Sequence, residues 1–176
     1  MIDITHLKDA VATELDELLT KSGFRRMPGK PDEYGFTVNY QSGQRYVSLR
    51  ANTHPRDYPA SFNIILGDGS LDWPECDWNA IALWRMRNFL EKNDRGTEFD
   101  LEGEADTAVL AAEARRQLEE FNGGFLDGDL TLFRKVRAQQ NREREPYKIF
   151  EPVGEGKYTE RPDSESERLK EKFSRE

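Results

Sequence analysis

One helix-like segment followed directly by strand-like segments constrains the fold of this chain most strongly. Apolar residues near the N-terminus recur every three or four positions, namely Ile4, Leu7, Val11, Leu15 and Leu18. This spacing places them on one face of a helix. Asp3 or Thr5 can cap its first turn, and Gly23 is suited to the left-handed residue that ends it, with Phe24 folding back as the apolar contact. We therefore predict an amphipathic helix that ends at Gly23-Phe24.

Three segments after this helix alternate apolar and polar residues. They are Tyr34–Tyr40, Arg45–Asn52 and Ser61–Leu66. Alternation sends successive side chains to opposite faces of a strand, and Gln41–Gln44 resembles a hairpin turn. The sequence thus predicts an antiparallel meander whose apolar face is covered by the first helix, which is an α+β arrangement.

The rest of the chain predicts further helices, a short fourth strand and a tail. The helices are expected over about Asp77–Lys92, Glu104–Phe121 and Asp129–Arg142, and the strand over Thr97–Leu101. We expect residues 1–150 to form one domain. Residues 151–176 are rich in charged residues, with Leu169 and Phe173 as an isolated apolar pair four residues apart. They predict a mobile tail that can form a short induced helix.

The charge distribution favours some partners over others. The chain of 176 residues has a formal net charge of −8. Residues 127–176 carry twelve cations and twelve anions, so the excess negative charge lies in the first 126 residues. An acidic body disfavours general binding to nucleic-acid phosphates. It suits docking onto a basic partner, or it serves solvation alone.

Cysteine and histidine usage indicates neither a disulfide framework nor a metal site. Cys76 is the only cysteine, and we expect it to behave as a partly buried apolar residue rather than a nucleophile. The two histidines, His6 and His54, do not form a zinc pattern, and no cofactor motif is present. The N-terminus lacks the pattern of a signal peptide, and no apolar run reaches the ~20 residues of a membrane span. We therefore expect a cytoplasmic protein without a membrane segment.

Two groups of residues are candidates for binding a protein partner. Trp73 and Trp78 lie close together in the sequence and form either a recognition surface or a hydrophobic plug, which their exposure distinguishes. Acidic residues form the second group, with Asp16 and Glu17 on the first helix and Glu104 and Asp106 at the start of the third. Plain solvation and the helix dipole are the simpler explanations for these acids.

Two alternatives belong to other classes of function. His54, Asp57 and Tyr58 in the 53–60 loop would suit an enzyme if they lined a pocket. The 134–144 helix is basic and would suit a nucleic-acid accessory protein. Its cations are Arg134, Lys135, Arg137, Arg142 and Arg144. No residue has a pattern that identifies it as catalytic.

The first helix with Gly23-Phe24-Arg25-Arg26, followed by Phe36–Tyr40 and Phe62–Leu66, resembles a bacterial family known as domain of unknown function 4304. The resemblance covers roughly residues 5–140, and Asn141–Phe150 and the tail lie outside it. It implies a small stand-alone or toxin-immunity-type protein, and it supplies no catalytic residues. We therefore expect a bacterial cytoplasmic binding protein that docks a basic, toxin-like partner through an acidic surface.

Overall fold

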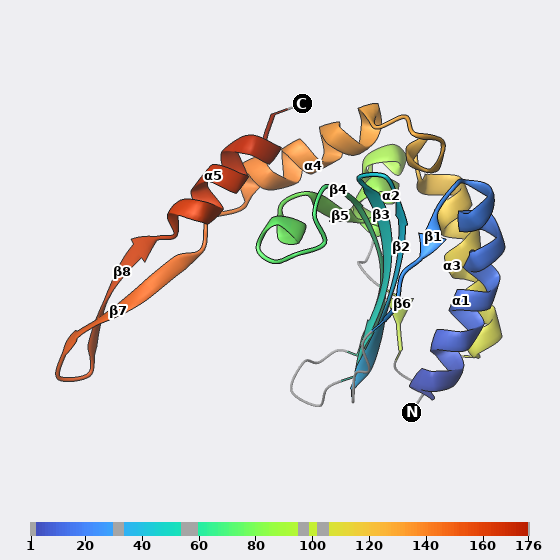
Figure 1. The fold of residues 1–176 in the computed structure, drawn as a ribbon, viewed down its shortest axis with the longest axis horizontal. Helices are drawn as coiled ribbons and strands as arrows, with labels where there is room; N and C mark the ends of the chain where they lie inside the picture. The colour runs from blue at the N-terminus through green and yellow to red at the C-terminus, as the bar shows by residue number, and fades with distance from the viewer. Residues whose placement is uncertain (1–2, 30–33, 54–59, 95–98, 102–105, 176) are drawn as a thin grey trace.

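The computed structural model describes residues 3–29, 34–53, 60–94, 99–101 and 106–175, and it has the predicted α+β fold (Figure 1). The helices are α1 (Ile4–Lys21), α2 (Leu83–Glu91), α3 (Thr107–Phe121), α4 (Thr131–Glu143) and α5 (Ser164–Phe173). The strands of the main sheet are β1 (Arg25–Arg26), β2 (Gly35–Ser42), β3 (Arg45–Asn52), β4 (Ser61–Asp68), β5 (Ala80–Ala82) and β6 (Phe99–Asp100). Strands β7 (Lys148–Gly154) and β8 (Lys157–Pro162) form a separate hairpin.

Helix α1 begins and ends as the sequence predicts. The Asp3 carboxylate accepts hydrogen bonds from the backbone amides of Thr5 and His6, at 2.9 and 3.1 Å. Gly23 has a φ of +81° at the other end. There the amides of Gly23 and Phe24 donate to the carbonyls of Thr20 and Leu19, which satisfies the last turn of the helix.

The predicted meander is the centre of a six-stranded antiparallel sheet. The order is β1-β2-β3-β4, with β5 and β6 both pairing with β4. Val38 pairs with Leu49, and Leu49 pairs with Ile64, so one face of the sheet is apolar across all three central strands. This register follows from the hydrophobic alternation, because a slip by one residue would turn the apolar set toward the other face.

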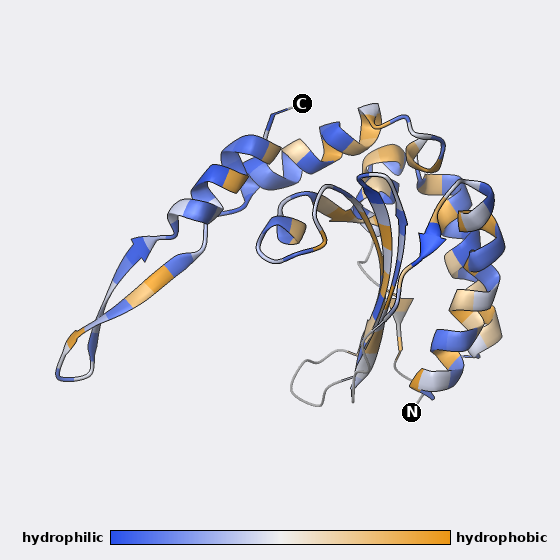
Figure 2. Ribbon diagram, viewed as in Figure 1, coloured by the Kyte–Doolittle hydropathy of each residue, from blue (hydrophilic) through white to orange (hydrophobic). Residues whose placement is uncertain are grey.

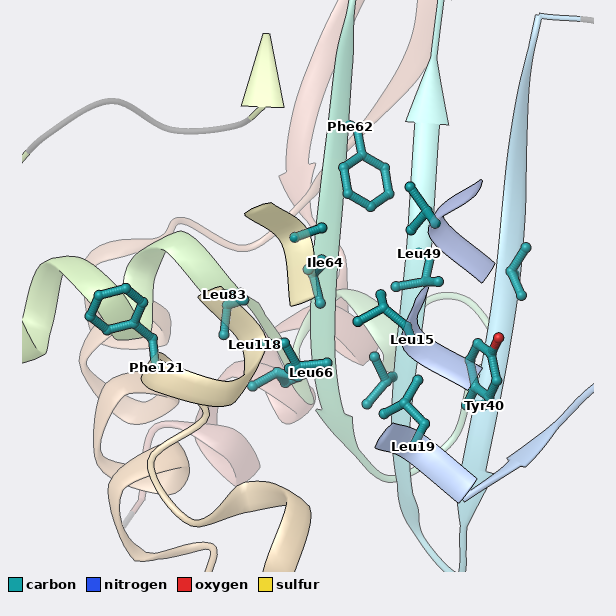
Figure 3. Packing of buried hydrophobic residues seen from close by; sticks show 14 of the residues in the cluster. Leu15, Leu19, Tyr40, Leu49, Phe62, Ile64, Leu66, Leu83, Leu118 and Phe121 are labelled. Atoms are coloured by element: carbon teal, nitrogen blue, oxygen red, sulfur yellow. The ribbon is translucent and has the colours of Figure 1, made fainter. Parts of the chain in front are cut away.

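Helices α1 and α3 pack side by side on the apolar face of the sheet (Figure 1). Figure 3 shows Leu15 and Leu19 of α1 facing Tyr40 and Leu49 of the sheet, and all four side chains are fully buried. Burial of side chains of this size stabilises the fold by about 1.5–3 kcal/mol each. The opposite face is covered at one end by the loop before β5, where the Tyr46 hydroxyl donates to the Asn79 side chain at 2.7 Å.

The region after β4 differs from the sequence prediction in its boundaries. The helix predicted from Asp77 is divided into a short 3-10 turn (Glu75–Asp77), strand β5 and helix α2. The β5 backbone pairs with Ile65–Gly67 of β4, and this edge pairing overrides the helical periodicity of the segment. The predicted fourth strand is present in its described part as β6.

The C-terminal region also differs from the sequence prediction. The expected domain boundary at residue 150 falls inside β7, and the predicted mobile tail contains β8 and α5. Leu169 and Phe173 are buried against Trp78 in a second apolar cluster. The spacing of Leu169 and Phe173 allowed a short helix, but local composition could not reveal that its apolar partner lies about ninety residues earlier in the sequence. We refer to residues 3–143 as the body and to residues 144–175 as the C-terminal unit.

Candidate interaction surface

Strands β7 and β8 form an arm that projects from the body (Figure 1). Its connecting residues, Glu155 and Gly156, have φ values of +47° and +73°. Positive φ at both central positions matches the tight turn that suits the twist of a two-residue hairpin. We refer to β7 and β8 together as the arm.

The pairing register divides the arm into two faces. Phe150 pairs with Glu160 and Pro152 pairs with Tyr158, so their side chains share one face. Lys148 on this face forms an ion pair with Glu160 at 2.9 Å. The other face carries the ion pair between Glu151 and Arg161, at 2.6 Å.

Large apolar side chains on the arm are open to solvent. The exposed fractions are 59% for Phe150, 63% for Val153 and 64% for Tyr158. Figure 2 shows a hydrophobic segment in β7 that contrasts with the hydrophilic colours of β8. A two-stranded hairpin is only marginally stable by itself, so this arm depends on how its base is held.

Backbone and hydroxyl hydrogen bonds hold the base of the arm through Tyr147. The Tyr147 amide donates to the Ser166 hydroxyl at 2.9 Å, and its carbonyl accepts from the Asp163 amide at 2.8 Å. The Tyr147 hydroxyl donates to the Asp77 carboxylate. Helix α5 and the loop before β5 therefore fix the direction in which the arm leaves the body.

Aromatic contacts reinforce the same base. The Tyr147 ring stacks on Trp73, with centroids 6.3 Å apart, and meets Trp78 edge-on at 5.8 Å. The Arg144 guanidinium lies 4.5 Å from the centroid of the Trp78 ring and donates to the Asp77 carbonyl. These contacts join the C-terminal unit to the body.

The two candidate tryptophans lie in different environments. Trp73 is 71% exposed, whereas Trp78 is fully buried between the two parts of the molecule. Trp78 is therefore not accessible to a partner, because Leu169, Phe173 and Tyr147 cover it. Trp73 remains a candidate, beside the base of the arm.

Two groups at the base, the Tyr147 hydroxyl and the Cys76 thiol, favour their neutral forms. Burial, followed by the hydrogen bond with Asp77, raises the pKa of Tyr147 to about 12. Burial and the nearby Asp77 also raise the pKa of the half-buried Cys76 thiol. Cys76 is partly buried, as the sequence predicts, and a raised pKa makes a thiol a poorer nucleophile.

The acidic candidates on α1 and α3 lie among cations. Asp16 and Glu17 are exposed, and Glu17 forms an ion pair with Lys21 at 2.6 Å. Arg115 bridges Glu14 of α1 and Glu119 of α3, at 3.8 and 3.2 Å. The acidic helix faces are therefore partly neutralised by neighbouring side chains.

Asp106 and Glu104 are the two acidic candidates near the start of α3. The exposed Asp106 caps this helix, with its carboxylate accepting from the Ala108 amide at 2.8 Å. This contact gives Asp106 a structural role in starting the helix. Glu104 lies outside the described residues.

The two alternative sites are the 53–60 loop and the basic 134–144 helix. His54, Asp57 and Tyr58 lie outside the described residues. In the basic helix, Arg134 forms an ion pair with Asp68 at 3.2 Å, and Arg137 is buried. The cations of 134–144 thus point to different partners rather than to one exposed surface.

Among the described residues, none of the helices has the length and apolar character needed to cross a bilayer. No three His, Cys, Asp or Glu side chains of the described part lie close enough together to hold a metal ion. No family model, curated protein or solved structure matches this chain. The resemblance to domain of unknown function 4304 therefore stays a prediction.

Sequence reasoning missed the arm, although the sequence contains a signal for it. The residues Gly154-Glu155-Gly156 are typical of a tight turn between two strands. The flanking segments also contain β-formers such as Ile149, Phe150 and Tyr158. The high charge of the surrounding residues obscured this local pattern.

Proposed function

We propose that this protein is a cytoplasmic binding protein of the toxin-immunity type, and that the arm docks it onto a basic protein partner. The observation that carries the proposal is the group of exposed apolar side chains on the arm. Phe150, Val153 and Tyr158 are each more than half exposed on an element that projects from the body. Exposed apolar surface of this kind is typical of sites of protein association.

The arm is suited to docking because its base is fixed while its faces are free of the main core. Tyr147 is held through its amide, carbonyl, hydroxyl and ring. A surface that is already ordered loses less conformational entropy when a partner binds. Aromatic side chains such as Phe150 and Tyr158 contribute large contact areas with few rotatable bonds.

Charge supports the choice of a basic partner. The chain carries a net charge of −8, whereas residues 148–162 carry three cations and three anions. A negative body would attract a basic protein over long range, and a neutral arm can then form the close apolar contacts. The immunity-type assignment rests on the family resemblance of the N-terminal region.

The test compares matched variants in partner capture. Phe150→Ser with Tyr158→Ser removes the aromatic side chains of one arm face. Val109→Ser is the control, because Val109 is 65% exposed on α3 and lies outside the arm. Each immobilised protein is exposed to native cell extract, and the captured proteins are identified by mass spectrometry.

The expected result is a basic protein that wild type and the control capture and that the double variant loses. Calorimetry with the purified partner should show binding weakened about tenfold or more by the double variant. Added salt should weaken binding of the wild type, because it screens long-range attraction. Equal affinity of the double variant and the control for the partner would exclude the arm as the docking surface.

A further inference from the structure

A groove between α2 and α4 lies apart from the arm and is large enough to hold a small molecule. Its volume is about 380 Å³, which lies within the range of ligand pockets. Trp84, Phe89 and Val136 supply apolar surface, and the other lining residues, among them Arg85, Asn88 and Glu143, are polar or charged. The lining is mostly polar, which favours a small ligand with charged or hydrogen-bonding groups over an apolar one.

Arg85 is the cation of this groove and has no anionic partner in contact. Its guanidinium lies 4.5 Å from the centroid of the Trp84 ring. The described residues provide it with neither a hydrogen bond nor an ion pair, although the side chain is half-buried. Stacking on an aromatic ring limits the orientations of the planar fork, which matches the two oxygens of a carboxylate.

Asn88 adds an acceptor to the same groove. Its side-chain Oδ1 is buried and has no hydrogen-bond partner among the described residues. Leaving a buried acceptor unsatisfied costs about 1–3 kcal/mol. A turn of the Asn88 side chain toward the groove would let a ligand N–H group remove this cost.

Acidic groups at the groove indicate that a ligand bound there would carry a positive charge as well as a negative one. Glu143 and Asp94 both line the groove, and neither comes within ion-pair distance of Arg85. Burial lowers the pKa of the Arg85 guanidinium, and these two carboxylates oppose that shift through space. A ligand with only negative charge would be repelled by them, whereas an ammonium group would be attracted.

We propose that the α2–α4 groove binds a small zwitterion, either a free α-amino acid or the end of a short peptide. The ligand carboxylate pairs with Arg85, and the ammonium or amide N–H groups face Asn88 and Glu143. Apolar parts of the ligand lie on Trp84, Phe89 and Val136. This assignment is independent of partner docking by the arm.

Leucine, glycyl-leucine and leucinamide are suitable probes. Each is titrated into the full ¹⁵N-labelled chain, and the Trp84 indole and Asn88 side-chain signals are followed by nuclear magnetic resonance. Leucine or glycyl-leucine should shift these signals saturably, and the one that binds more tightly identifies the source of the ligand. Leucinamide, which lacks the carboxylate, should bind about tenfold more weakly or worse.

Arg85→Gln tests the assigned contact, with Arg116→Gln on the exposed face of α3 as the matched control. The first should weaken binding of the tighter probe about tenfold, and the second should leave it unchanged. Arg85→Lys keeps the charge without the planar fork and should give an intermediate affinity. Absence of saturable shifts with both leucine and glycyl-leucine would overturn the proposal, as would equal binding by Arg85→Gln and wild type.

Discussion

The body and the C-terminal unit are held together by different kinds of interaction. The body has a continuous apolar cluster that joins the sheet to α1 and α3. The C-terminal unit contributes two buried apolar residues, Leu169 and Phe173, which meet Trp78 of the body. Directional contacts of Arg144 and Tyr147 add to its attachment. Burial of apolar surface thus stabilises the body, and a few hydrogen bonds set the orientation of the arm.

Two polar residues of α4 connect these regions. Asn141 is fully buried and donates to the carbonyls of Trp78 and Phe173, at 2.7 and 3.1 Å. Arg137 is buried with its guanidinium 5.3 Å from the Phe133 ring centroid and 4.8 Å from that of Phe173. Helix α4 therefore belongs to the body and also carries the contacts that position the C-terminal unit.

The largest expected effect comes from the centre of the body. Leu49→Ala should lower the free energy of unfolding by about 2–5 kcal/mol, because a fully buried leucine leaves a cavity between sheet and helix. Chemical denaturation measures this change. Leu90→Ala is the control, since Leu90 is 42% exposed, and a change below about 0.5 kcal/mol is expected there. Equal effects of the two variants would contradict the assigned core.

A core substitution in the C-terminal unit should have a more local effect. Leu169→Ala should weaken the packing of α5 by about 2–4 kcal/mol, because it removes one of the two apolar residues that this helix buries. Hydrogen exchange should become faster in α5 while α1 and β2–β4 keep their protection. Equal acceleration throughout the body would show that both regions unfold as one unit.

Removing the polar connection should have a smaller effect. Asn141→Ala leaves two carbonyls without their side-chain donor and should cost about 1–3 kcal/mol in the attachment of the C-terminal unit. Gln139→Ala, at an exposed position of the same helix, is the matched control. Exchange in α5 reports the difference, and identical rates in both variants would argue against this role of Asn141.

The smallest expected effect concerns alkaline pH. Because the pKa of Tyr147 is raised to about 12, the folded state favours the neutral hydroxyl. The resulting stabilisation is complete below about pH 10, the ordinary tyrosine value, and is lost as pH rises toward the folded pKa. Tyr147→Phe should therefore lose less stability than wild type between about pH 8 and about pH 11 in denaturant titrations. A parallel pH dependence in both proteins would contradict the raised pKa.

The contrast between the regions also explains what the sequence could predict. In the body, the periodicity of Leu7, Val11 and Leu15 and the alternation of Phe36, Val38 and Tyr40 are local signals of burial. They led to the correct α+β fold and to the central meander. Strand β5 was missed because its three residues lie inside a helix-like periodic pattern and become a strand only through pairing with the edge of β4.

The candidate surface was harder to predict for the same reason. Trp73 and Trp78 have similar neighbours in the sequence, yet their exposed fractions are 71% and 0%. The difference arises from α5, whose Leu169 and Phe173 cover Trp78 and lie about ninety residues further along the chain. Local sequence therefore located the aromatic residues and could not determine which of them reaches the surface.

Hydrogen exchange across the free wild-type chain tests most directly whether the arm is held only at its base. The predicted result is slow exchange in β2–β4 and α1, intermediate exchange in α5 and at Tyr147, and the fastest of the three in residues 148–162. Arm amides as strongly protected as those of the central sheet would contradict the account, because the arm would then be packed and unavailable to a partner.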